Sequence, residues 1–266
     1  MAAFVQAGRE GGAGESELAA YDFSATRLFV DAPLGHDAKV ELDRGQANYL
    51  LSVLRLKDGD AILAFNGRDG EWRARIASGG RKAAALVPTE RVREQPEPSR
   101  LVYLFAPLKH ARLDYMVQKA VEMGVGRLQP VFTRRTVASR VNEERMRANA
   151  VEAAEQCGIL AVPEIGEAAP LWAALDALPP ETLVIFCDEE APVADPLAAL
   201  SGADVSAGCA LVIGPEGGFD GAERSLLLAR AATRRLSLGP RILRADTAAV
   251  AALAIVQAAI GDWRAP

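Results

Sequence analysis

The chain has 266 residues, of which 50% are hydrophobic, and this suits one large domain or two modest ones with a buried core. Two histidines and three cysteines, with no Cys-X-X-Cys pair, exclude most metal sites and argue against a Ser-His-Asp triad, so we expect no metal. The net charge of −5 argues against a generally basic nucleic-acid binder, but residues 109–147 carry nine Lys and Arg against four Asp and Glu. This cluster is either a nucleic-acid-binding face or a solvated helix face. No apolar run reaches about 18 residues and no secretory signal is present, so we expect a cytoplasmic protein without a membrane span.

The first part of the chain changes character near residue 26. Residues 1–25 are rich in Gly, Ala and Glu with little periodicity, which predicts a disordered extension. Short β-like runs follow, separated by turn signals such as Asn66-Gly67, and they cover residues 27–30, 61–65, 71–76 and 84–88. A helix-like pattern covers residues 46–54. We therefore expect a small β-barrel-like domain over residues 26–93.

The rest of the chain alternates between strand and helix patterns. Residues 94–99 contain two prolines among charges and indicate a linker. Beyond it, buried strands are predicted at 101–106, 128–132, 183–187 and 209–213, and helices at 113–121, 142–157, 220–231 and 247–261. Asp220 with Glu223 resembles a capping box at the start of the third helix. This alternation predicts an α/β domain with a mostly parallel sheet over residues 100–266.

Two loops near the C-terminus each follow a strand-like run, at residues 210–213 and 236–238, and precede a helix. They are Gly214-Pro215-Glu216-Gly217-Gly218-Phe219 and Leu238-Gly239-Pro240-Arg241-Ile242-Leu243-Arg244. Ligands of open α/β sheets bind at the carboxyl ends of strands, so the two loops predict one shared pocket. The glycines allow close backbone approach and the prolines stiffen the loops, which suits a flat, hydrogen-bonding ligand. The alternative is a pair of tight structural turns, in which Glu216 is an exposed turn residue.

These loops, together with upstream motifs, resemble the ribosomal small subunit methyltransferase E family of the SPOUT superfamily. The family methylates N3 of a uridine in 16S ribosomal RNA. The resemblance covers nearly the whole chain after residue 26. Its motifs here are Arg27-Leu28-Phe29-Val30, Lys109, Gln118-Lys119-Ala120, Glu122, Gly124-Val125, Glu152-Ala153-Ala154-Glu155-Gln156-Cys157, Pro163, the two loops, Glu223 and Thr247-Ala248.

The resemblance implies a fold and ligands that composition alone does not. The C-terminal domain is expected to be a SPOUT α/β knot domain, and the N-terminal domain a PUA-like RNA-binding β-barrel. The implied cofactor is S-adenosyl-L-methionine and the implied partners are 16S ribosomal RNA, within the small ribosomal subunit, and a second copy in a homodimer. The cofactor-binding residues expected from this are Gly214, Pro215, Glu216, Gly217, Gly218, Leu238, Gly239, Ile242, Leu243, Thr247 and Ala248. For Ile242 and Leu243 the alternative is a place in the core.

Catalysis and RNA binding need cations. Loss of the uridine N3 proton leaves an anion that a nearby cation stabilises, and Arg244, at the edge of the second loop, is the candidate. Its alternative is an ion pair with Asp246 or Glu216. The candidate phosphate contacts are Arg27, Lys109, Arg112, Lys119, Arg134, Arg135 and Arg140, each of which is otherwise solvated.

The chain departs from the family pattern at two positions. Ile159 stands where the family has Arg, so an RNA contact there has to come from elsewhere, with Arg134 or Arg135 as candidates. Asp246 stands where the family has Glu, and it can still cap the final helix. Two other functions remain open at this point: methylation of another RNA base, and a non-catalytic RNA-binding role in ribosome assembly.

Overall fold

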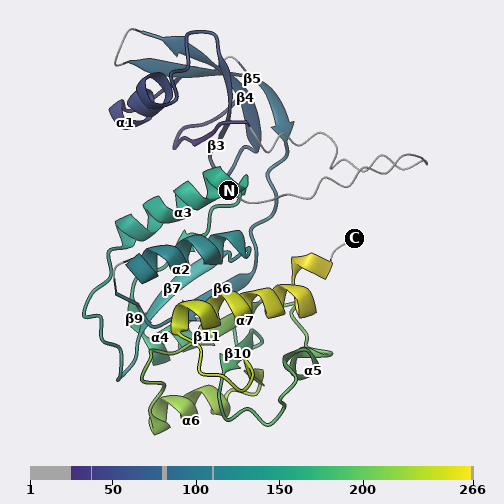
Figure 1. The fold of residues 1–266 in the computed structure, drawn as a ribbon. Coiled ribbons are helices and arrows are strands. Elements are labelled where there is room, and N and C mark those ends of the chain that lie inside the picture. Colours follow the sequence, from purple (N-terminus) through teal and green to yellow (C-terminus); the bar gives the residue numbers. More distant parts are fainter. Residues whose placement is uncertain (1–24, 37, 80–82, 110, 265–266) are drawn as a thin grey trace, which may run out of the picture.

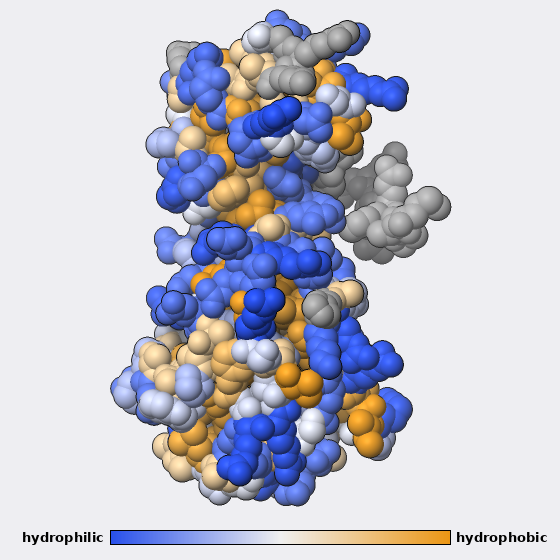
Figure 2. Space-filling view, turned by 90° about the vertical axis from the view of Figure 1, so that its left-hand side faces the viewer, coloured by the Kyte–Doolittle hydropathy of each residue, from blue (hydrophilic) through white to orange (hydrophobic). Residues whose placement is uncertain are grey.

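The computed structural model describes residues 25–36, 38–79, 83–109 and 111–264. The predicted N-terminal extension therefore lies outside the described residues, except for Ala25. Two lobes are visible, each built around its own sheet (Figure 1). Figure 2 shows hydrophobic residues reaching the surface among hydrophilic ones on one face of the lower lobe. Within the described residues, no helix is both long and apolar enough to span a bilayer.

The N-terminal lobe is a five-stranded sheet in the order β1-β3-β4-β5-β2. β1 runs parallel to β3, and the other neighbours are antiparallel. The elements are β1 (Arg27–Phe29), β2 (Val40–Glu41), α1 (Arg44–Asn48), the π-helical turn η2 (Tyr49–Val53), β3 (Ala61–Phe65), β4 (Glu71–Ser78) and β5 (Ala84–Arg93). The predicted strands and the helical segment are confirmed, and short β2 was not foreseen from the sequence.

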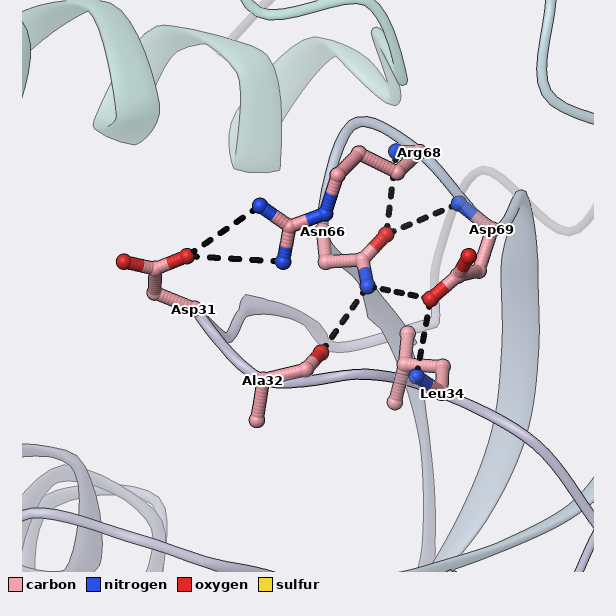
Figure 3. Close-up of polar contacts among 6 residues, drawn as sticks. All are labelled: Asp31, Ala32, Leu34, Asn66, Arg68 and Asp69. Atoms are coloured by element: carbon pink, nitrogen blue, oxygen red, sulfur yellow. Dashed lines mark hydrogen bonds and ion pairs between the residues drawn. The ribbon is translucent and has the colours of Figure 1, made fainter.

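The β3–β4 turn is fixed by the buried amide of Asn66 (Figure 3). Its Oδ1 accepts from the N–H groups of Arg68 and Asp69 at 3.0 and 2.9 Å. Its Nδ2 donates to the Ala32 carbonyl at 2.8 Å and to Asp69 Oδ2 at 2.6 Å. Asp69 Oδ2 also accepts from the Leu34 N–H at 2.9 Å. The turn predicted at Asn66-Gly67 is confirmed, and it also holds the segment that follows β1.

The C-terminal lobe contains a parallel sheet in the order β12-β10-β11-β6-β7-β8, with β9 paired to the end of β7. Its strands are β6 (Leu101–Phe105), β7 (Arg127–Phe132), β8 (Glu164–Ile165), β9 (Ala169–Pro170), β10 (Leu183–Cys187), β11 (Cys209–Ile213) and β12 (Thr233–Leu236). Every strand pair in the described part of this sheet is parallel, so the predicted α/β class is confirmed. The strand predicted at 236–238 lies earlier than expected, because β12 ends at Leu236.

Alternate residues of these strands enter two different cores. Tyr103, Phe105 and Leu211 face one core, which is covered by α2 (Ala111–Glu122), α3 (Glu143–Cys157), α5 (Pro196–Leu200) and α7 (Ala245–Ile260). Leu104 and Val212 face the other core, which is covered by α4 (Leu171–Asp176) and α6 (Gly221–Ala229). A strand buried on both faces explains the continuous apolar runs in the sequence.

The two lobes are joined by direct contacts. Phe65 of the N-terminal sheet packs within the core of the C-terminal lobe. The Phe29 N–H donates to Glu155 Oε1 on α3 at 2.8 Å, and Arg93 donates to the Gly158 carbonyl that caps α3 at 2.8 Å. Burial raises the pKa of Glu155, whereas the hydrogen bond from the Phe29 N–H acts to lower it. A polar cleft of about 400 Å³ lies beside these contacts and is lined by Ala25, Thr26, Arg27, Tyr49, Glu152, Glu155 and Gln156.

Candidate functional site

The two special loops lie at the same edge of the parallel sheet. The first follows the carboxyl end of β11 and the second that of β12. β10 lies between these strands, so the loops flank the end of β10 instead of being immediate neighbours. A third segment, which begins at Asp188, therefore belongs to the same edge.

The first loop is a tight turn over an aromatic side chain. The Gly218 N–H donates to the Pro215 carbonyl at 2.8 Å, and Gly218 has a φ of +70°. A Cβ on Gly214 would come within 2.8 Å of the Phe219 ring. The Phe219 ring in turn contacts Phe186 of β10, with ring centroids 5.4 Å apart. The glycines are therefore needed for backbone conformation and for close packing.

A capping box follows the first loop and opens α6, as the sequence predicts. Asp220 Oδ1 accepts from the Glu223 N–H at 2.8 Å, and Glu223 Oε2 accepts from the Asp220 N–H at 2.9 Å. The second Glu223 oxygen accepts from the backbone N–H of Arg134 at 2.7 Å. The same carboxylate thus joins the first loop to the segment that follows β7.

The second loop is more exposed. Gly239 has a φ of +90° and donates its N–H to Ser237 Oγ at 3.3 Å. Leu238 and Leu243 are half-buried against the core, which agrees with the core alternative for Leu243. Ile242 is 99% exposed, so a place in the core is ruled out for this residue. A Cβ added to Gly239 or to Gly218 would meet nothing within 4 Å. Both loops therefore have room beside the backbone for a ligand.

Arg244 is exposed and occupies the N-cap position of α7. Its side chain makes no ion pair with any residue that the structure describes. Glu216 pairs instead with Arg112, and Asp246 Oδ1 accepts from the Thr247 N–H at 2.9 Å. The predicted cap at Asp246 is wrong, because α7 begins at Ala245 and places Asp246 inside the first turn. Thr247 is exposed beside it and Ala248 is buried.

Two of the predicted RNA-contacting arginines meet the first loop, and a third lies beside the capping box that follows it. Arg112 Nη1 lies 3.5 Å from Glu216 Oε1, and Arg135 Nη1 donates to the Gly217 carbonyl at 2.6 Å. Arg134 Nε lies 3.9 Å from Asp220 Oδ2, with most of its side chain exposed. The structure thus brings the predicted cofactor loop and part of the predicted RNA face together.

Comparison with known proteins identifies the family. The RNA methyltransferase domain model matches residues 95–257, and the RNA methyltransferase PUA domain model matches residues 42–89. Ribosomal RNA small subunit methyltransferase E of Rickettsia conorii is 31% identical over 232 residues, which cover 87% of this chain and 94% of that protein. The chain belongs to the ribosomal RNA small subunit methyltransferase E family. The Synechocystis member is 35% identical over 240 residues, covering 88% of this chain and 78% of that protein.

Solved structures of a methyltransferase E protein and of a putative methyltransferase share the fold. The Neisseria gonorrhoeae enzyme, bound to S-adenosyl methionine, superposes with a TM-score of 0.76 at 26% identity, covering 88% of this chain and 97% of that one. A Legionella pneumophila protein in complex with the cofactor SAM gives 0.75 at 27% identity, covering 88% and 98%. The N-terminal lobe is therefore a PUA-type domain on an α/β methyltransferase domain. The knot itself stays a prediction, because strand order does not show which segment passes through which loop.

The remaining predicted RNA contacts of this methyltransferase E protein differ in exposure and in their partners. Lys109 is exposed just after β6 at the loop edge, and Arg140 is exposed in the segment after β7. Lys119, in the last turn of α2, pairs with Glu122 at 2.6 Å, and this hydrogen bond raises its pKa. Ile159, at the position of the family Arg, packs against the core.

Arg27 is the one candidate that the structure removes from the surface. Only 2% of its side chain is exposed, and its Nε donates to the buried Glu71 at 3.0 Å. Arg93 shares the same carboxylate, with Nε 2.8 Å from Glu71 Oε2. A phosphate contact at Arg27 stays a prediction that this geometry disfavours, because Glu71 of β4 engages the buried guanidinium.

One group at the loop edge was missed from the sequence. Asp188, directly after β10, is buried and accepts from Arg235 Nε at 2.7 Å and from Arg224 Nη2 at 3.0 Å. Arg235 also donates to the Glu190 carbonyl. These bonds tie the β10 segment to α6 and β12. An aspartate directly after a predicted buried strand was the available signal. Among the described residues, no group of three His, Cys, Asp or Glu side chains is placed to hold a metal ion.

Proposed function

We propose that this protein transfers a methyl group from S-adenosyl-L-methionine to N3 of a uridine in 16S ribosomal RNA. The observation that carries the proposal is the direct contact between the first loop and the exposed arginines. Arg112 and Arg135 bond to Glu216 and Gly217, within the segment that the family resemblance assigns to the cofactor. Methyl donor and RNA backbone would therefore meet at one edge of the sheet. Membership in the methyltransferase E family supports the same conclusion.

The two loops offer the kinds of contact that the cofactor requires. Leu238 and Leu243 offer half-buried apolar surface for a flat adenine, and the open space beside Gly218 and Gly239 exposes backbone N–H and carbonyl groups for hydrogen bonds. The exposed Ile242 and Thr247 border the same region. S-adenosylmethionine supplies an electrophilic methyl group on a positively charged sulfur, so few catalytic side chains are required.

Arg244 is assigned to the uridine. Removal of the N3 proton leaves negative charge on the imide, and the Arg244 guanidinium, which has no ion-pair partner among the described residues, is free to stabilise it. Packing of the base against the loops would exclude water and align N3 with the methyl group. The residue that accepts the N3 proton is not assigned.

The proposal extends to the assembly state and the setting. The family resemblance supports a homodimer that acts in the cytoplasm on the small ribosomal subunit. Mass measurement of the purified protein in solution tests the dimer. A monomer that methylates its substrate at full rate would overturn that part alone.

A methyl-transfer assay tests the reaction. The protein is incubated with labelled S-adenosylmethionine and with small ribosomal subunits from a strain that lacks this methylation, and naked 16S RNA runs in parallel. Methylation at N3 blocks Watson–Crick pairing, so we expect incorporated label and one new reverse-transcription stop beside a uridine. Binding of the cofactor without label in either substrate would overturn the proposed substrate. Absence of cofactor binding would overturn the activity.

A further inference from the structure

An exposed tryptophan lies at the loop edge of the sheet. Trp172 is the second residue of α4, and 59% of it is exposed. α4 follows β9 directly, and Pro170 of β9 pairs with Phe132 at the carboxyl end of β7. Trp172 therefore lies at the edge that carries the two special loops.

Packing of α4 does not require this indole. Leu171, Ala174 and Leu175 form the buried side of the helix and enter the core beneath it. Trp172 lies outside that set. A large aromatic side chain that is left in water at a functional edge is a candidate for ligand contact.

Two exposed arginines, Arg134 and Arg135, lie at the same edge, in the segment that follows Phe132. The Arg134 N–H is bonded to Glu223 on α6, and α4 packs against both α6 and β7. An exposed aromatic ring and exposed guanidinium groups at one sheet edge match single-stranded RNA, in which phosphates alternate with bases that can stack. An apolar partner protein would leave these charges uncompensated.

We propose that Trp172 stacks an unpaired base of the RNA substrate, next to the uridine that is methylated, while Arg134 and Arg135 contact the adjoining phosphates. This inference rests on the proposed function and adds a base-binding residue to it. A uridine that reacts at N3 has to leave its stack and its pair. A ring that holds a neighbouring base would keep the strand open at that point.

The test compares three variants. Trp172→Ala removes the ring, Trp172→Phe keeps an aromatic face, and Trp263→Ala is the matched control. The exposed fraction of Trp263, 55%, is similar to that of Trp172. Trp263 follows α7 at the opposite edge of the sheet, where Gln257 of α7 donates to the Met123 carbonyl just before β7. We expect Trp172→Ala to raise KM for RNA roughly 5- to 100-fold, as loss of one stacked base does. Cofactor affinity and melting temperature should stay unchanged, with Trp172→Phe and Trp263→Ala close to wild type.

Fluorescence gives a second readout that does not depend on turnover. Trp72 is buried, so in Trp263→Phe the exposed tryptophan is Trp172, and we expect an RNA fragment to quench it. When Trp172→Phe is combined with Trp263→Phe, that quenching should be lost. Equal KM values for Trp172→Ala and Trp263→Ala would overturn the inference, and so would a change of oligomeric state in Trp172→Ala. If the wild-type protein methylates no RNA, the proposed function fails, and quenching then decides the role of Trp172.

Discussion

Arg244 is the residue on which the proposed chemistry depends most directly. It is the last residue before α7, and its alternative partners are engaged elsewhere, Glu216 by Arg112 and Asp246 by the first turn of the helix. From the sequence, a cation at this loop could be predicted. Whether this cation already has an ion-pair partner could not be predicted, because ion pairs between distant segments depend on the fold.

We predict that Arg244→Ala lowers kcat for methyl transfer by about 10²- to 10³-fold and leaves cofactor affinity nearly unchanged, because it removes charge stabilisation of the N3 anion. Arg244→Lys should recover part of the rate. The variant rate should also rise more steeply with pH, since hydroxide then has to generate the anion. Steady-state kinetics on the RNA substrate measure this. Arg241→Ala, an exposed arginine of the same loop, is the control, and an equal loss there would contradict the assignment.

Asp69 offers a pH-dependent test in the N-terminal lobe. The Leu34 N–H, followed by the Asn66 amide, lowers the pKa of Asp69 below its ordinary value of 3.8. A lowered folded pKa contributes stability that is complete above 3.8 and is lost as pH falls through the folded value. We predict that Asp69→Asn destabilises the protein at pH 7 and that its deficit shrinks toward pH 3.

Urea unfolding of wild type and Asp69→Asn at both pH values measures this. Asp31→Asn serves as a control for net charge, because Asp31 is exposed and pairs only weakly with Arg68 at 3.4 Å. A deficit of Asp69→Asn that is the same at both pH values would contradict the prediction.

At the scale of elements, the loops and their glycines were readable from the sequence, and the strand order was not. Gly-Pro-Glu-Gly-Gly followed by Asp220 and Glu223 predicts a turn and a capping box, since both are local, and both are present. The position of β10 between β11 and β12 depends on long-range pairing. For that reason Asp188 and its two arginines were missed, although the strand before Asp188 and the helix that carries Arg224 were assigned correctly.

Gly218 and Gly221 form a matched pair for testing the first loop. A Cβ at either position meets nothing within 4 Å, but only Gly218 has a positive φ, of +70°. We predict that Gly218→Ala weakens cofactor binding roughly tenfold, because a strained backbone of about 1–3 kcal/mol relaxes away from the bound conformation. Gly221→Ala, at the start of α6, should bind normally. Calorimetry measures both, and equal affinities would remove the case for a conformational requirement.

At the scale of the whole molecule, the buried Glu71 joins three strands and the domain junction. It accepts from Arg27 of β1 and Arg93 of β5, and Arg93 also reaches the Gly158 carbonyl beyond α3. From the sequence, Arg27 was a candidate phosphate contact. Its enclosure depends on the register that sets β1 against β3 and β4, which local patterns do not specify.

We predict that Glu71→Ala lowers the free energy of unfolding by about 3–5 kcal/mol, because it removes the carboxylate shared by two guanidinium groups, one of them buried. Glu90→Ala is the control, since its pair with Arg73 is exposed on the same sheet and is worth less than about 1 kcal/mol. Denaturant titration measures both. Similar losses would show that burial of Glu71 is unimportant.

The bonds from β1 and β5 to α3 also determine how the protein can engage a folded RNA. Because Phe29 and Arg93 are anchored on α3, the PUA-type domain is held at a set separation from the loop edge. When one site of a rigid ligand is bound, its second site gains a high effective concentration only if the ligand spans that separation. On the proposed function, a folded RNA that spans this separation would bind more tightly than a short oligonucleotide that carries the target uridine alone.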